Sequence, residues 1–84
     1  MPDSPRLSTT AYELSGVGDD NDVNRVTDEM STVPDVGAVA IEIAPGGGVT
    51  MFVKHKADVT LDRAAIDAAV RRAGKYAVVA ERPR

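Results

Sequence analysis

The feature that most constrains the fold of this 84-residue chain is a repeated change in the spacing of its apolar residues. Four stretches, each about as long as a β-strand, carry apolar residues that alternate with polar ones or cluster together: 9–15, 38–44, 49–54 and 75–80. Two other stretches, 22–33 and 61–73, carry apolar residues at spacings of three and four, which predicts amphipathic helices. The order strand, helix, strand, strand, helix, strand predicts an α+β, ferredoxin-like open-faced sandwich. In this fold a four-stranded antiparallel sheet carries both helices on one face.

Local signals set the expected boundaries of these elements. Pro34 is expected to stop the first helix, because the residue before a proline disfavours the helical conformation. The Pro45–Gly48 stretch predicts the turn of a β-hairpin. Thr60 is the expected N-cap of the second helix, and Gly74 is expected to follow its C-cap. We therefore expect a disordered leader over 1–8, one domain over 9–80 and a charged tail over 81–84.

Composition limits the classes of function. With 10 Lys and Arg against 13 Asp and Glu, the net charge is −3, which argues against nucleic-acid binding. No stretch approaches the ~20 apolar residues of a membrane span, so direct membrane insertion is not expected. The N-terminus lacks the pattern of a secretory signal, which favours a cytoplasmic location. The chain has no Cys, one His and no Gly-x-Ser-x-Gly motif, so we do not expect an enzyme.

The predicted topology brings specific polar residues together. It places the acidic loop over 16–22, the Gly hairpin over 46–48 and Lys75 at one end of the sheet. The single imidazole, His55, follows the third strand at the opposite end, and we expect it to be an exposed loop residue. The acidic loop is therefore the expected functional end of the molecule.

The element order and several spaced anchors resemble the heavy-metal-associated domain of copper chaperones and of metal-pumping P-type ATPases. The matching segments are Gly16-Val17-Gly18-Asp19-Asp20-Asn21-Asp22, Val33-Pro34-Asp35-Val36 and Ala73-Gly74-Lys75-Tyr76. In this resemblance the two metal-binding cysteines of the family fall on Asp19 and Asp22, and its methionine falls on Val17. Carboxylates suit hard divalent cations, whereas thiolates select Cu(I), so Cu(I) binding through thiolates is excluded.

Two interpretations of the acidic loop remain open at this point. In the first, Asp19 and Asp22, assisted by Asp20, hold a divalent cation that relieves the repulsion among the carboxylates. In the second, the acidic residues cap the following helix and complement its dipole without a ligand. Lys75 could pair with Asp19 or Asp22 and take the place of a metal, or be a solvated lysine.

Two functions follow from the resemblance. The first is a metal-handling domain, either a small chaperone or the N-terminal domain of a metal transporter, that docks its loop end (Asp19, Asp20, Asp22 and Lys75) onto a basic partner surface. The alternative is a relative that has lost its metal and acts as a protein-interaction or regulatory module. The chain could be a whole protein or the first domain of a larger pump.

Overall fold

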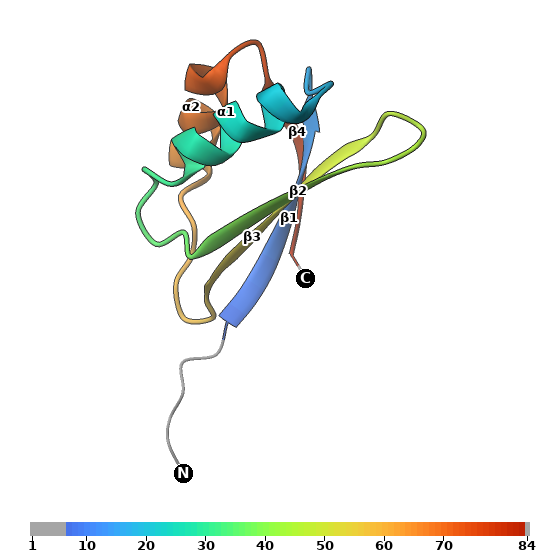
Figure 1. Ribbon diagram of the computed structural model, residues 1–84. Helices are drawn as coiled ribbons and strands as arrows, with labels where there is room; N and C mark the ends of the chain where they lie inside the picture. The colour runs from blue at the N-terminus through green and yellow to red at the C-terminus, as the bar shows by residue number, and fades with distance from the viewer. Residues whose placement is uncertain (1–6, 84) are drawn as a thin grey trace.

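The computed structural model describes residues 7–83. Its elements, in chain order, are β1 (Leu7–Ser15), α1 (Asp20–Met30), β2 (Ala38–Ile43), β3 (Val49–Lys56), α2 (Arg63–Ala73) and β4 (Ala77–Pro83). The strands form one sheet in the order β2-β3-β1-β4, with antiparallel pairing between all neighbours. Both helices lie on the same face of this sheet (Figure 1). The predicted α+β, ferredoxin-like fold is confirmed.

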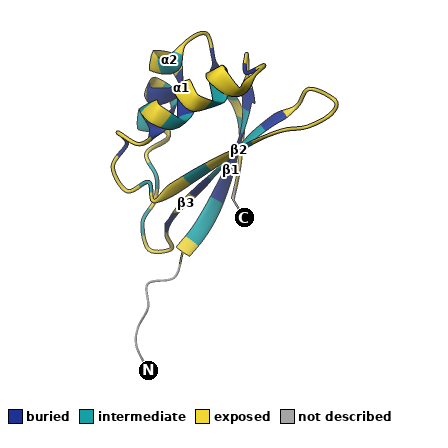
Figure 2. Ribbon diagram, viewed as in Figure 1, coloured by how far each residue is buried: buried dark blue, intermediate teal, exposed yellow. Residues whose placement is uncertain are grey.

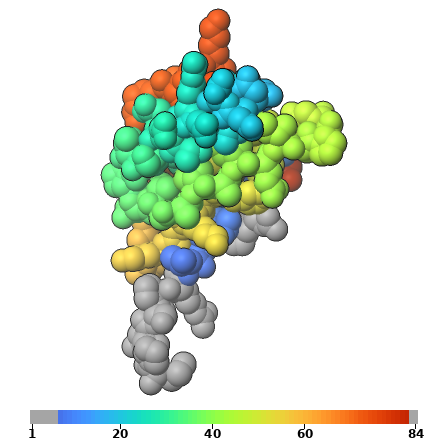
Figure 3. All heavy atoms as spheres, in the orientation of Figure 1, coloured from blue at the N-terminus to red at the C-terminus, as the bar shows by residue number. Residues whose placement is uncertain are grey.

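The β2–β3 hairpin closes through a three-residue turn. The Ala44 N–H donates to the Gly48 carbonyl at 2.7 Å, and the Gly47 N–H donates to the Ala44 carbonyl at 2.9 Å. Gly47 has φ +93°, a conformation that side chains disfavour and that a bulged hairpin turn requires. The hairpin tip projects from the body of the molecule in the space-filling view (Figure 3).

The hydrophobic core lies between the sheet and the two helices. Alternate residues of β1 and β3 face the helices, and each helix packs its apolar face against the sheet. The buried residues are therefore concentrated in this layer (Figure 2). The largest fully buried side chains are Tyr12, Met30, Met51, Ile66, Val26, Val53 and Val70. Because the chain has few aromatic residues, this core depends on aliphatic packing around Tyr12.

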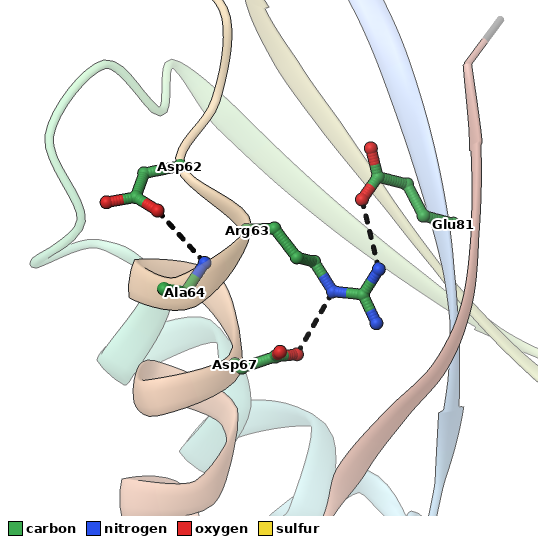
Figure 4. A network of polar contacts seen from close by, with 5 residues as sticks. All are labelled: Asp62, Arg63, Ala64, Asp67 and Glu81. Carbon is green, nitrogen blue, oxygen red and sulfur yellow. Dashed lines mark hydrogen bonds and ion pairs between the residues drawn. The ribbon is translucent and has the colours of Figure 1, made fainter.

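Charged contacts tie α2 to its neighbours. The Arg72 guanidinium donates to Glu29 at 3.0 Å and to Thr32 at 3.3 Å, which joins the end of α2 to the end of α1. At the start of α2, Arg63 lies between Asp67 and Glu81 of β4 and donates to each at 3.2 Å (Figure 4). These exposed pairs orient the helices more than they stabilise them.

Several expected boundaries were wrong. Helix α1 ends at Met30 rather than at Val33, the residue before Pro34, because Ser31 and Thr32 turn their hydroxyls back onto the carbonyls of the last turn. The N-cap of α2 is Asp62 and not Thr60: its carboxylate accepts from the Ala64 N–H at 3.0 Å.

The strands at both ends of the chain also extend past the expected domain limits. β1 begins at Leu7 rather than Thr9, and its first residues pair with the end of β3. β4 begins at Ala77, after the expected start at Lys75, and runs into the expected tail as far as Pro83. Residues 1–6 of the expected leader and Arg84 lie outside the described part of the chain.

Candidate functional site

The acidic loop between β1 and α1 is built around the N-cap of α1. Asp19 is the cap residue: its backbone is extended, and its Oδ1 accepts a hydrogen bond from the Asp22 N–H at 3.0 Å. Asp20 and Asn21 follow in the first turn with exposed side chains. Asp19 therefore has the capping role, and a negative side chain there complements the helix dipole.

Asp22 closes the loop with both of its carboxylate oxygens. Oδ2 accepts from the Gly18 N–H at 2.9 Å, while Oδ1 accepts from the hydroxyl of Tyr76, which comes from the segment before β4. Tyr76 is buried, with 6% of its surface exposed, whereas Asp22 is half-buried. The carboxylate thus connects the two loops that meet at this end of the sheet.

These contacts shift two pKa values in opposite directions. The Tyr76 hydroxyl, and then the Gly18 N–H, hold the pKa of the Asp22 carboxyl below its usual value, and the positive charge of Arg25 acts in the same direction. The bond to Asp22 raises the pKa of the Tyr76 phenol, and burial adds to that increase. At neutral pH the pair is therefore a carboxylate that accepts from a neutral phenol.

Close packing of two glycines keeps these loops together. A Cβ on Gly16, which has φ +87°, would lie 2.5 Å from the Lys75 carbonyl oxygen. A Cβ on Gly74 would lie 2.9 Å from the Tyr76 ring. Both positions thus need the absence of a side chain for the backbone and ring to approach as they do.

Lys75 and the Gly hairpin do not complete a site around the acidic loop. Within residues 7–83, no ion pair joins the exposed Lys75 to Asp19 or Asp22. A Cβ on any of the three glycines at the hairpin tip would meet no atom within 4 Å, so the tip stands apart from the loop. Neither Lys75 nor the Gly hairpin therefore joins the acidic loop in a common site, whereas Tyr76 does contact the loop.

The carboxylates of the loop do not form a ready set of metal ligands. Both oxygens of Asp22 and one oxygen of Asp19 already accept hydrogen bonds from the protein. In the described part of the chain, no three His, Asp or Glu side chains converge in a way that could hold a metal ion. Among the described residues, the carboxylates of Asp19 and Asp22 therefore bond within the protein and are not grouped as metal ligands.

His55 differs from the prediction of an exposed loop residue. It lies within β3, 8% exposed, on the face that carries Val49, Met51 and Val53. Its Nδ1 lies 3.0 Å from the Lys56 carbonyl oxygen, and its Nε2 lies 2.9 Å from the Thr10 hydroxyl. Because a carbonyl can only accept, Nδ1 carries a proton and donates it to the Lys56 carbonyl oxygen, while Nε2 pairs with the Thr10 hydroxyl. If the alternation at Val49, Met51 and Val53 had been continued to position 55, it would have predicted that this ring is buried.

Comparisons of the chain with family models, curated proteins and solved structures gave no match. The resemblance to heavy-metal-associated domains therefore remains a prediction from the residues. Within residues 7–83, neither helix is long and apolar enough to cross a membrane.

Proposed function

We propose that this chain is a non-catalytic protein-interaction domain, related to the heavy-metal-associated family, whose acidic loop works without a metal. The observation that supports this best is the bonding of Asp22. The residue that replaces a metal ligand accepts from the Gly18 N–H and the Tyr76 hydroxyl, so the loop is held closed from within. A metal bound there would have to share these oxygens with donors that already hold the carboxylate in place.

The surface that the loop offers to a partner is negative. Asp19 and Asp20 are exposed at the start of α1, next to the half-buried Asp22, and the chain carries a net charge of −3. Charges of one sign on an exposed end accelerate encounter with a surface of the opposite sign. The partner in this proposal is a cytoplasmic protein domain with a basic docking surface, such as part of a metal transporter.

A divalent-cation site on Asp19, Asp20 and Asp22 is the competing function. An NMR titration of amide shifts with Mn(II), Zn(II), Co(II), Ni(II), Ca(II) and Cu(I) separates the two. We expect no saturable change at residues 16–22 and 74–76 in the wild-type protein. Saturable binding that disappears in Asp19→Ala/Asp22→Ala, but persists in the charge-matched Asp28→Ala/Asp58→Ala control, would overturn the metal-free proposal.

A second titration tests the docking surface with a Lys-rich peptide as a basic probe. We expect shifts confined to residues 19–22 and their neighbours, which weaken as salt screens the charges. Asp19→Ala/Asp20→Ala should remove these shifts, whereas Asp28→Ala/Asp58→Ala should keep them. Equal loss in both double variants would mean that only net charge attracts the probe, which contradicts a specific loop surface.

A further inference from the structure

The two edges of the sheet are protected unequally. Along β4, the pairing with β1 shifts register between Glu13 and Leu14, and the strand ends in Glu81, Arg82 and Pro83. A bulge, charges and a proline are the usual means by which proteins stop an edge strand from pairing with another chain. β2 (AVAIEI) pairs with β3 without a register shift and contains no proline and a single charge, Glu42.

The hairpin turn determines which backbone groups of β2 are free. Ala44 and Gly48 form a hydrogen-bonded pair next to the turn. In an antiparallel ladder such pairs alternate with non-bonded pairs, so Ala38, Ala40 and Glu42 direct their backbone groups toward β3. The backbone N–H and C=O groups of Val39, Ile41 and Ile43 therefore point to the open edge of the sheet. In the space-filling view, β2 lies on the viewed surface of the molecule (Figure 3).

We propose that β2 is a self-association strand, which pairs in an antiparallel manner with β2 of a second copy of this chain about a twofold axis at Ile41. In this register Ile41 lies opposite its own copy, and Val39 lies opposite Ile43. Every edge-facing N–H and C=O of β2 then has a partner, because each of these residues falls in a hydrogen-bonded pair. The two sheets become one continuous sheet with all helices on the same face.

The side chains of β2 fit this self-pairing. Ile43 is one of the three large apolar residues that are notably exposed among the described residues, at 41%, and the pairing places it beside Val39 of the second copy. Glu42 lies opposite Ala40 of the second copy, so the twofold axis brings no like charges together. A strand of a different protein is the other partner that an open edge can take. No feature of the described residues favours such a strand in the way that the symmetric match of Val39 with Ile43 favours a second copy.

The expected dimer is weak. Two six-residue strands bury less than the ~1,600 Å² of a standard stable interface, so the association should depend on concentration. The surface does not include Asp19, Asp20 or Asp22, and the inference is independent of the proposed docking of the acidic loop.

Sedimentation equilibrium of the full chain up to ~1 mM tests the pairing. We expect the average mass to rise from 8.8 kDa toward twice that value. Ile43→Pro removes an edge-facing N–H without removing a bond to β3, and it should abolish the rise, while Ile43→Val should keep it. A monomer at all concentrations, or a dimer unaffected by Ile43→Pro, would overturn the proposal.

A pair of charge variants tests the register without relying on proline. Ala40→Lys places a positive charge opposite Glu42 of the second copy in both symmetric positions, so the dissociation constant should fall roughly fivefold. Ala40→Glu places like charges there, and the dissociation constant should rise by a similar factor. If the dissociation constant changed in the same direction in both variants, Ala40 and Glu42 of the two copies would not face each other.

Discussion

The hydroxyl of Tyr76 donates a hydrogen bond to the carboxylate of Asp22, a residue 54 positions earlier in the chain. This single contact connects the loop before α1 to the segment that enters β4. It also engages one oxygen of the carboxylate that the competing metal-site hypothesis would use as a ligand. The behaviour of this pair is therefore the most direct way to examine what the loop end does.

The Asp22–Tyr76 contact should make stability depend on pH in the acid range. The folded-state pKa of Asp22 is lowered from 3.8, so its contribution is fully present above about pH 3.8 and is lost as the pH falls through the lower folded-state value. We expect wild type to be more stable than Asp22→Asn at pH 6, with the difference shrinking below pH 3.8. Urea unfolding across this range measures it.

Tyr76→Phe is the matched variant for this experiment. It removes the largest cause of the lowered Asp22 pKa and keeps the ring that packs against Gly74. The acid-range loss of stability should therefore be smaller in Tyr76→Phe than in wild type. An identical pH profile in the two proteins would mean that the hydrogen bond does not form in solution.

The tyrosines should resist ionisation. Burial, and then the charge of Glu81, raise the pKa of Tyr12 to about 12, and the bond to Asp22 raises that of Tyr76. The stability that their neutral forms provide is present below about pH 10 and is lost as the pH rises through the folded-state values. Absorbance titration at 295 nm should show little tyrosinate at pH 10, and Tyr12→Phe should remove the phase near pH 12. Appearance of half the tyrosinate signal at pH 10 in folded protein would contradict this.

Gly16 and Gly46 should respond very differently to alanine. Gly16→Ala introduces a Cβ 2.5 Å from the Lys75 carbonyl oxygen at a positive φ, so we expect a loss of about 1–3 kcal/mol in the free energy of unfolding. Gly46→Ala meets open space and should change stability by less than ~0.5 kcal/mol. Chemical denaturation of both variants checks this, and similar losses would show that the loops are not packed as described.

The buried imidazole provides another test. Thr10→Val removes the hydroxyl that forms a hydrogen bond with His55 Nε2 and leaves a buried ring nitrogen without that partner. We expect a loss of about 1–3 kcal/mol in the free energy of unfolding. Thr9→Val, on the opposite face of the same strand, is the control and should stay within ~0.5 kcal/mol.

The sequence predicted the topology because the relevant information is local. Alternation in β1 and β3 and helical spacing around Val26 and Ile66 each follow from residues a few positions apart. The contact between Tyr76 and Asp22 could not be predicted in this way, since it depends on how two distant loops meet. His55 is buried because β3 continues two residues beyond the expected end at Lys54. The lysines on both sides of His55 had suggested a loop there.

At the start of α2, contacts with neighbouring residues favour one of two plausible N-cap residues. Thr60 and Asp62 are both good N-cap residues, and the local pattern did not favour Asp62. The helix begins after Asp62, where Arg63 can reach both Asp67 and Glu81 of β4 (Figure 4). Asp62→Ala should therefore cost about 1 kcal/mol of unfolding free energy, and Thr60→Ala less than ~0.5 kcal/mol. A larger loss for Thr60→Ala, measured by thermal or urea unfolding, would place the cap where the sequence first indicated.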